Sequence, residues 1–329
     1  MPGMPRLLIT LGDVAGIGPE VLVRAWPEPA LHDLCRPLVV GDVATLTRTI
    51  DALGSAIRLE TVEQPAAARP TPGVMPVVQG TRADLRDVQP GRVAAFAGQA
   101  AYDFLVMAID LALAGDAHGI VTLPLHKEGL RAAGVAFPGH TEILAHRTGS
   151  TSHAMMLWHN GLGVSHVTLH MALREVFDHI TQESVLAKIE LTARMVGRLK
   201  HCEPRIGVCA LNPHASDGGL FGDEEQKIIA PAVVRARAQG LNVSGPWPSD
   251  TLFIRAVRGE FDGVVAMYHD QGHIAMKLLA DYRAVNITLG LPIVRTSVAH
   301  GTAYDIVGKG LADPRGLIEA VRAAAQLCG

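Results

Sequence analysis

Residues 6–20 read RLLITLGDVAGIGPE, an apolar run that passes through a glycine-rich turn into a longer amphipathic stretch. Gly16 and Gly18 permit a tight turn, and Pro19 suits the first position of a helix. The segment therefore predicts a strand that leads directly into a helix. A helix N-terminus here could bind an anion, but a turn that simply requires glycine explains the pattern equally well, because neither GxGxxG nor GxxxxGK[ST] is present.

The same alternation of short apolar runs and longer amphipathic stretches continues along the chain. Most of the runs are nearly continuous in Val, Ile and Leu, which is typical of parallel strands covered on both faces. Helices are expected at 184–200, at 224–239 with a kink at Pro231 and a C-cap at Gly240, and from about 315 to 326. Further strands are expected at 37–40, 119–123, 164–169, 206–211 and 263–268. The sequence predicts an α/β protein with a mostly parallel sheet.

Composition limits the class of protein. A chain of 329 residues predicts two domains or lobes, and 48% apolar with 19% charged residues argues against disorder. The net charge of −3, without a long run of one sign, gives no support to binding of nucleic acid or anionic membranes. No apolar segment reaches the roughly 18 residues of a membrane span, and the N-terminus lacks signal-peptide features. With no CxxC pair among its four cysteines, the protein is expected to be soluble, cytoplasmic and reduced, with Cys209 as a buried free thiol.

Three histidines follow predicted strands, namely His170, His214 and His269. Sites in open parallel sheets form beyond the carboxyl ends of the strands, so these imidazoles are candidates for one catalytic divalent metal site. Asp217 and Asp270 are placed to support two of them by hydrogen bonds. The long separations lack a spacing such as HExxH, and ordinary capping or packing roles remain the alternative.

Other polar candidates stand in apolar or glycine-rich surroundings. They are His140, Thr141, Lys277, Asn286 and Arg295. A lysine and an arginine with apolar neighbours are natural anchors for carboxylate or phosphate, although snorkelling or a structural ion pair explains each one alone. The glycines of residues 300–314, HGTAYDIVGKGLADP, indicate a loop whose backbone closely approaches a ligand.

Taken together, these segments resemble the PdxA family, which comprises 4-hydroxythreonine-4-phosphate dehydrogenase and its D-threonate and D-erythronate 4-phosphate dehydrogenase relatives. The resemblance covers essentially the whole chain and rests on an ordered set of motifs: GDVAGIGPE, LPLHKEG, FPGHTE, LNPHASDGG, SDTLF, MYHDQGH, VNITLGLPIVRTSV and HGTAYDIVGKG. It implies two α/β/α lobes with a central cleft, as in the isocitrate and isopropylmalate dehydrogenases. Residues 1–127 plus 288–329 would form the cofactor-side lobe, and residues 128–287 the lobe for metal, substrate and dimerisation.

The resemblance also implies roles for single residues. The divalent metal (Zn, Co, Mn, Mg or Ni) would be held by His170, His214 and His269, contributed from both subunits of a homodimer. The substrate would be bound by His140, Thr141, Lys277, Asn286 and Arg295, and NAD or NADP by Gly301, Thr302 and Ala303. Turnover would require His214 as a ligand, and the proton acceptor would be Lys277 or a metal-linked water.

The implied reaction is oxidation of the 3-hydroxyl of a 4-phosphorylated hydroxy acid, followed by decarboxylation of the 3-keto acid, as in pyridoxine biosynthesis. His273 departs from the HDQG-Leu-Pro of the biosynthetic enzymes and resembles the D-threonate or D-erythronate branch, or the aromatic cis-dihydrodiol dehydrogenases of the terephthalate type. His140, Thr141 and Arg295 favour a phosphorylated substrate. Two further alternatives are a metal-dependent hydrolase or lyase that uses no nicotinamide, and a non-catalytic small-molecule binding protein.

Overall fold

The first apolar run forms β1 (Arg6–Thr10), which pairs in parallel with β2 (Arg36–Gly41) on one side and with β5 (Gly119–Thr122) on the other. Leu7, Leu8 and Ile9 of this strand are fully buried. Burying a side chain of this size contributes about 1.5–3 kcal/mol. The glycine-rich turn leads into α1 (Gly18–Ala25), which has proline in its first turn as predicted.

The computed structural model describes residues 3–329, and contacts within the chain define two compact units. Unit 1 comprises Met1–Thr151 and Leu291–Gly329, and unit 2 comprises Ser152–Gly290. The chain passes from unit 1 to unit 2 between residues 151 and 152, whereas the sequence analysis placed this boundary between 127 and 128. It returns to unit 1 between residues 290 and 291, instead of between 287 and 288. Residues 128–151 belong to unit 1 because their helices pack on α4 (Ala95–Leu113). Gly98 of α4 and Gly129 are so close that a Cβ on Gly98 would lie 2.0 Å from the Gly129 carbonyl oxygen.

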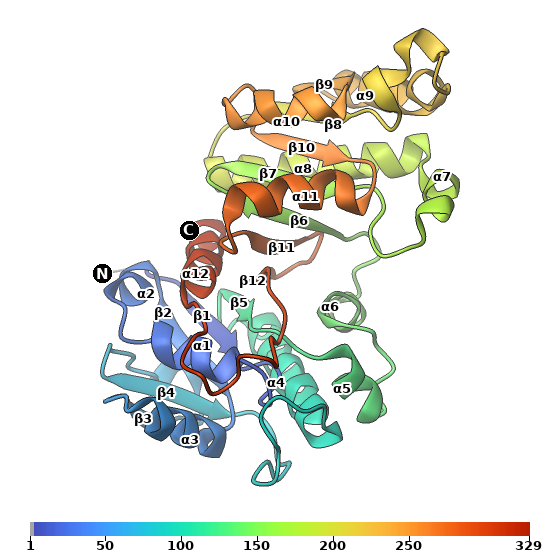
Figure 1. Ribbon diagram of the computed structural model, residues 1–329. Coiled ribbons are helices and arrows are strands. Elements are labelled where there is room, and N and C mark those ends of the chain that lie inside the picture. The colour runs from blue at the N-terminus through green and yellow to red at the C-terminus, as the bar shows by residue number, and fades with distance from the viewer. Residues whose placement is uncertain (1–2) are drawn as a thin grey trace. The chain divides into compact units, whose positions relative to one another are not determined.

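Unit 1 is built on a six-stranded, wholly parallel sheet in the order β3-β4-β2-β1-β5-β12 (Figure 1). The helices α1, α2, α3 and α12 pack together on one side, and α4, α5 and α6 form a second layer. The further elements of this unit are α2 (Pro29–Leu34), α3 (Val43–Leu53), β3 (Arg58–Thr61), β4 (Val74–Gln79), α5 (Lys127–Ala132), α6 (His140–Thr148), β12 (Val294–Val298) and α12 (Arg315–Cys328).

Unit 2 has a mixed sheet in the order β11-β6-β7-β10-β8-β9. The pairs β11–β6 and β6–β7 are antiparallel, and the remaining pairs are parallel. Helices α8 and α9 pack together, while α10 and α11 pack on the sheet separately from them. The elements are β6 (Ala154–His159), β7 (Leu162–His166), α7 (Val176–His179), α8 (Gln182–Lys200), β8 (Ile206–Cys209), α9 (Ala230–Ala238), β9 (Val243–Trp247), α10 (Ser249–Val257), β10 (Gly263–Ala266), α11 (His269–Ala280) and β11 (Val285–Leu289).

The predicted α/β class is confirmed, and most predicted elements are present. The stretch expected as one helix at 224–239 begins as a π-helical turn, Glu225–Ile229, and continues as α9 with Pro231 in its first turn. The strand expected at 164–169 ends earlier, at His166. Cys209 is buried and free, and burial raises the pKa of its thiol to about 12.

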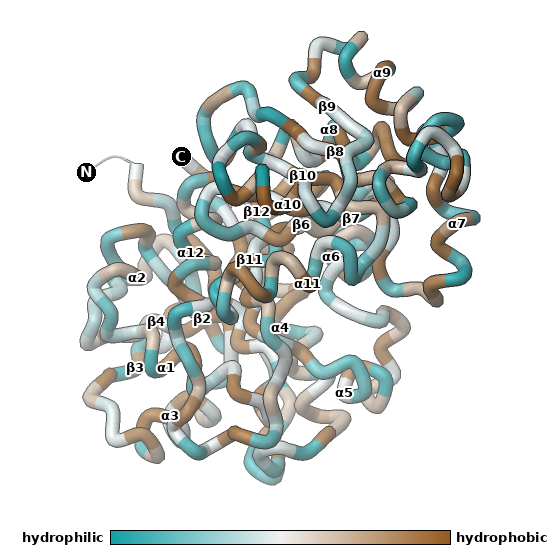
Figure 2. Tube along the Cα trace, turned by 45° about the horizontal axis from the view of Figure 1, so that its top comes forward, coloured by the Kyte–Doolittle hydropathy of each residue, from teal (hydrophilic) through white to brown (hydrophobic). Residues whose placement is uncertain are grey.

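Among residues 3–329, α4 is the one helix long and apolar enough to cross a membrane. Half of that apolar stretch is buried, with Phe104 and Leu105 in the core. Figure 2, which colours the chain by hydropathy, shows α4 in its place among the other helices. Because α4 packs on α5, α6 and three strands of the unit 1 sheet, it has the contacts of a core helix.

Candidate active site

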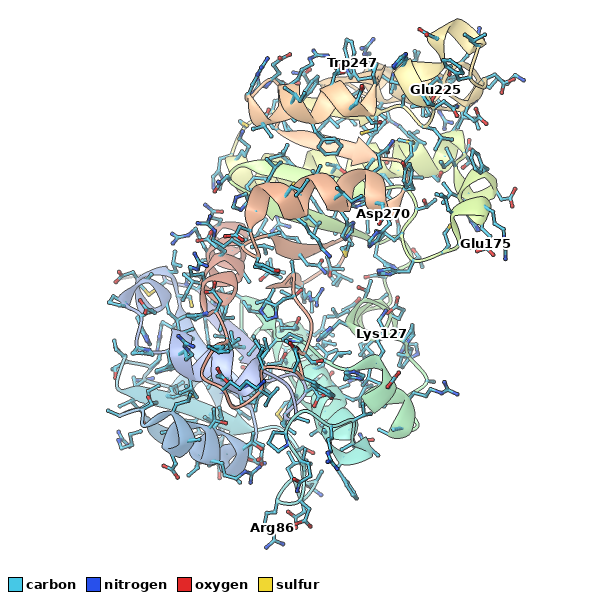
Figure 3. The ribbon with its side chains drawn as sticks, viewed as in Figure 1. Arg86, Lys127, Glu175, Glu225, Trp247 and Asp270 are labelled. Atoms are coloured by element: carbon cyan, nitrogen blue, oxygen red, sulfur yellow. The ribbon has the colours of Figure 1, made fainter. Side chains whose placement is uncertain are left out.

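Two of the predicted metal ligands lie side by side in unit 2. His170 follows β7, and His269 follows β10 and begins α11; the two strands are parallel neighbours, so their carboxyl ends lie at the same edge. The ring centroids are 5.6 Å apart. His269 Nδ1 lies 2.6 Å from Asp270 Oδ1, at the start of α11, where Figure 3 labels Asp270. A carboxylate that accepts the Nδ1 proton leaves Nε2 as the electron-pair donor, as a metal ligand requires.

A small cavity adjoins this pair of imidazoles. It has a volume of about 280 Å³ and is lined by His170, His269, Asp270 and Tyr268, together with the apolar residues Leu169, Met171, Leu173 and Val176. A volume near 300 Å³ is at the lower end of the range for small-molecule sites. The two rings therefore stand next to a space large enough for a small polar ligand.

The structure does not bring His214 to the same place. It follows β8, the other neighbour of β10, but its side chain is 67% exposed and its nearest charged partner is Asp217, 3.6 Å from Nδ1. Within residues 3–329, no group of three His, Cys, Asp or Glu side chains is arranged to hold a metal ion. The donor chemistry of His170 and His269 fits a divalent metal, but the described chain brings together only these two of the three predicted ligands.

Glu225, which Figure 3 labels, forms hydrogen bonds to the loop that carries His214. Residues 214–218 all have positive φ, between 48° and 72°, which for non-glycine residues costs about 1–2 kcal/mol each. The buried carboxylate of Glu225 accepts the backbone N–H groups of Leu211 and Asn212, each at 2.7 Å, and side-chain donors of Asn212 and Ser216. Burial alone would raise the pKa of Glu225, but these hydrogen bonds outweigh it and lower the pKa. The sequence carries no local signal for this role.

Two further histidines, His166 and His273, join the pair in unit 2. The rings of His269 and His273 stack with centroids 3.8 Å apart and 9° between their planes. His273 Nδ1 lies 3.1 Å from His166 Nε2. Burial first, and the neighbouring imidazoles second, hold the pKa of His166 well below its usual range; the same causes lower the pKa of His273 to about 4. Both rings are therefore neutral at pH 7. His273 was noted from the sequence as a departure from the motif of the biosynthetic enzymes, whereas His166 was given no role. The position of His166 inside an apolar run indicates a buried histidine and could have singled it out.

Lys277 and Asn286 also belong to unit 2. Lys277 is exposed on α11, one turn beyond His273, and its positive charge contributes to the lowered pKa of that histidine. Asn286 lies in β11 opposite Leu157 of β6, and its Oδ1 is buried without a hydrogen-bond partner in the described chain. An unsatisfied buried acceptor costs about 1–3 kcal/mol, so this oxygen is suited to a ligand donor.

Arg295 is the buried cation of unit 1. It lies in β12, is 2% exposed, and donates to Thr122 Oγ1 on the neighbouring β5 at 2.7 Å. Burial lowers its pKa to about 10, while the negative charge of Glu142 acts in the opposite direction. Burial, and then the charge of Arg295, hold the pKa of His140 well below its usual range. His140 and Thr141 begin α6, and a guanidinium beside a neutral imidazole is suited to binding an anion.

The loop with Gly301, Thr302 and Ala303 packs against the first glycine-rich turn. Ile17 N donates to Thr302 O at 3.0 Å, and a Cβ on Gly16 would lie 2.9 Å from Thr302 Cβ. The turn therefore needs glycine at 16 in order to let this loop approach.

Two carboxylates of the same motif hold the loop further along. Tyr304 Oη donates to the buried Asp13 Oδ2 at 2.5 Å, and Glu20 accepts the backbone N–H groups of Gly308 and Ala312 at 3.2 and 3.0 Å. Burial raises the pKa of Asp13, although the hydrogen bonds from Tyr304 and from the backbone of Ala15 act in the opposite direction. The ring of His126, which the sequence left without a role, stacks on Tyr304 with centroids 4.8 Å apart.

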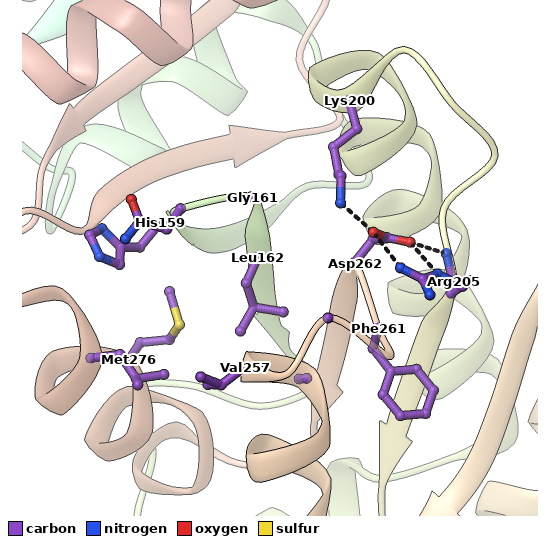
Figure 4. Close-up of a pocket in the computed structure, with 13 residues that line it drawn as sticks. His159, Gly161, Leu162, Lys200, Arg205, Val257, Phe261, Asp262 and Met276 are labelled. Atoms are coloured by element: carbon purple, nitrogen blue, oxygen red, sulfur yellow. Dashed lines mark hydrogen bonds and ion pairs between the residues drawn. The ribbon is translucent and has the colours of Figure 1, made fainter.

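A second cavity in unit 2, of about 270 Å³, contains a charged cluster that is satisfied internally (Figure 4). Asp262 is paired with Lys200 and with Arg205, whose Nε donates to Oδ2 at 3.0 Å and whose backbone N–H donates at 2.9 Å. These donors outweigh burial and lower the pKa of Asp262. The cluster joins the start of β10 to that of β8, and we assign it a structural role.

Known proteins resemble this chain along both units. Residues 33–324 match the family model described as "Pyridoxal phosphate biosynthetic protein PdxA". A 4-hydroxythreonine-4-phosphate dehydrogenase of Desulforapulum autotrophicum is 44% identical, over 98% of this chain and 95% of its own. A D-threonate 4-phosphate dehydrogenase of Salmonella typhimurium is 46% identical, over 97% of this chain and 98% of its own. A crystal structure of 4-hydroxythreonine-4-phosphate dehydrogenase from Klebsiella pneumoniae matches with a TM-score of 0.91 and 42% identity, over 100% of this chain and 99% of that one.

Proposed function

From the premise that the chain belongs to the PdxA family, whose relatives are named dehydrogenases of phosphorylated hydroxy acids, we propose a metal-dependent, NAD(P)-dependent oxidative decarboxylation. The overall reaction moves a hydride from C3 of a 4-phosphorylated hydroxy acid to NAD(P)⁺ and releases the hydroxyl proton. The resulting 3-keto acid then loses CO₂.

The observation that carries the proposal is the pair His170 and His269 beside a small cavity, with Asp270 behind His269. A divalent metal on these rings would supply positive charge beside the substrate hydroxyl and so lower the pKa of that hydroxyl. Since the described chain brings together only two of the three predicted ligands, we propose that His214 of a second copy supplies the third.

A homodimer is supported by the surface of α11. Ile274, Leu278 and Leu279 are 58%, 81% and 40% exposed on this helix. Clustered large apolar side chains on a surface favour a protein interface. An exposed His214 is likewise available to another copy, and a twofold axis would create two shared sites in one dimer.

The residues of the chain itself would bind and orient the substrate. Arg295 pairs with the phosphate, His140 and Thr141 complete the anion contacts at the start of α6, and the open Oδ1 of Asn286 accepts a substrate hydroxyl or amine. Lys277, exposed on α11, is the candidate acceptor for the hydroxyl proton.

The nicotinamide cofactor would lie on the loop of Gly301, Thr302 and Ala303. This loop is tied to the first motif through Asp13 and Glu20, so its backbone is held in place before any ligand arrives. A preorganised loop loses less conformational entropy on binding. That the enzyme works in the cytoplasm stays a prediction.

The test is the absorbance of reduced nicotinamide on mixing the protein, a divalent metal and NAD⁺ or NADP⁺ with a panel of acids. The panel contains 4-hydroxythreonine 4-phosphate, D-threonate 4-phosphate, D-erythronate 4-phosphate and an aromatic cis-dihydrodiol. We expect turnover with one of the phosphorylated acids and none without metal. Turnover of the dihydrodiol alone would contradict the role of Arg295, and substrate consumption without nicotinamide reduction would point to a hydrolase or lyase.

The shared site has its own test, in which inactive variants are mixed. His214→Ala and His269→Ala proteins are each expected to be inactive. A mixed dimer regains one intact site, so random exchange of subunits would restore about a quarter of the wild-type activity. No recovery in a mixture shown to exchange subunits would contradict a site built from two copies.

A further inference from the structure

We propose that His273, itself held by His166, is a positioning residue that fixes the plane of the His269 imidazole. The inference rests on the proposed role of His269 as a metal ligand, and it assigns a function to two buried histidines that the mechanism does not otherwise use. It is carried by packing, hydrogen bonds and ring geometry within unit 2.

Strand β7 and helix α11 approach each other closely at His166 and Gly272. His166 is the last residue of β7 and is 1% exposed. Its ring lies directly against the helix backbone at Gly272, where a Cβ would be 2.3 Å from His166 Nε2 and 2.9 Å from Val164 Cγ1. Only glycine leaves room for the imidazole at this point, so His166 is locked between the strand and the helix.

The ring of His166 is hydrogen-bonded to His273 of α11. His273 Nδ1 lies 3.1 Å from His166 Nε2 and 3.2 Å from the carbonyl oxygen of His269. Because the carbonyl oxygen can only accept, His273 carries a proton on Nδ1 and donates it to both acceptors. The ring of His273 is 8% exposed, and two polar contacts at one nitrogen determine both its position and its orientation.

His273 in turn contacts His269, the proposed metal ligand. His269 and His273 are one helical turn apart, so their side chains lie on the same face of α11. Their rings are stacked at 3.8 Å and 9°. His269 is the first residue of the helix and its side chain is 33% exposed; its other ring neighbours, His166 and His170, lie farther away, with centroids at 6.4 and 5.6 Å, so the stack with His273 is its closest ring contact.

Two partners thus divide the task of orienting His269. The bond to Asp270 decides which nitrogen carries the proton, because a flipped ring would lose it. The stack with His273 decides the plane in which the ring lies, since a tilt would open the contact. A leucine at 273 would fill the volume, but it could neither bond to His166 nor offer a flat face.

The experiment measures the affinity of the full-length protein for Zn²⁺, by competition with a chelating indicator. His273→Leu removes the bond and the stack, and we expect Zn²⁺ binding about 10- to 100-fold weaker, as is usual when a supporting partner of a metal ligand is lost. His273→Phe keeps a flat face and is expected to recover most of the affinity. His273→Asn keeps a hydrogen-bonding group without a ring and is expected to stay weak. His179→Leu, an exposed histidine of the same unit, is the matched control.

Thermal unfolding of each variant shows whether the fold is retained, and His269→Ala separates the two claims. If His269→Ala loses Zn²⁺ binding while His273→Leu binds within about twofold of wild type, the positioning role is wrong and the metal site stands. If His269→Ala binds Zn²⁺ like wild type, both are wrong. If Leu and Phe at 273 are equally weak although both are folded, the stack is not the cause and the inference is overturned. An ordered series of wild type, Phe and Leu, with His179→Leu unchanged, supports it.

Discussion

Replacing Glu225 with glutamine tests how the loop that carries His214 is held. The carboxylate is 4% exposed and accepts four hydrogen bonds, two at each oxygen. Glutamine has one oxygen, so two of these donors would face an NH₂ group instead. The Ser216 hydroxyl can turn to accept from that NH₂ group, so the side-chain N–H of Asn212 is the donor left unsatisfied, which predicts a loss of about 1–3 kcal/mol in the free energy of unfolding. The left-handed backbone of residues 214–218 would then relax.

The assay is urea unfolding followed by far-UV circular dichroism, with Glu224→Gln as the matched control. Glu224 accepts a single side-chain bond, from Asn212 at 2.7 Å, and its amide can keep that bond, so we expect a loss below about 1 kcal/mol. The pKa of Glu225 is lowered in the folded protein, so its stabilisation is present above the unfolded pKa of about 4.3 and is lost as pH falls through the folded pKa. The gap between wild type and Glu225→Gln should therefore shrink in acid. Equal losses for the two glutamine variants, or a gap that does not change with pH, would refute the reasoning.

Three further outcomes are expected. Tyr304→Phe leaves the buried Asp13 carboxylate with one donor fewer, and NAD(P)⁺ affinity measured by calorimetry should fall about tenfold with little change in KM for the acid; unchanged nucleotide affinity would separate this bond from the cofactor loop. Arg295→Met should raise KM for the phosphorylated substrate by about 10- to 100-fold and leave nucleotide affinity intact, and an unaltered KM argues against an anion anchor. His214→Ala should abolish metal-dependent turnover while the melting temperature stays within about 2 °C of wild type, because the side chain is exposed; activity that persists after chelation would rule out the ligand role.

The local sequence pattern predicts the α/β class and six strands of residues 3–329, because most of these strands are short, nearly continuous apolar runs. The run at 6–11 becomes β1, and the runs at 206–211 and 263–268 become β8 and β10. Strands β3, β4, β6, β9, β11 and β12 were not predicted. Strands β3 and β9 at the sheet edges lack continuous apolar runs, since only part of each is buried, whereas β4, β6, β11 and β12 are largely buried and were missed all the same. The boundary between the units depends on helix packing that includes the contact between Gly98 and Gly129. A local sequence pattern does not predict a contact between residues so far apart in the sequence.

For the site, the position of a histidine after a strand is predictive where the chain turns directly into a helix. His269 begins α11 and lies near His170, as the strand-end argument requires. His214 is different, because its loop follows a left-handed path set by Glu225, a residue eleven positions away. The His166–His273 contact joins a strand to a helix through Gly272, so neither histidine alone shows it in the sequence.

The most direct measurement is an anomalous difference map, collected at the zinc edge from crystals of the protein grown with Zn²⁺. The account predicts one strong peak per chain, bonded to His170 and His269 at about 2.0–2.1 Å, with His214 of a second copy as the third imidazole. A zinc ion bound elsewhere, or bound to His170 and His269 with His214 of every copy remote from it, would contradict the account.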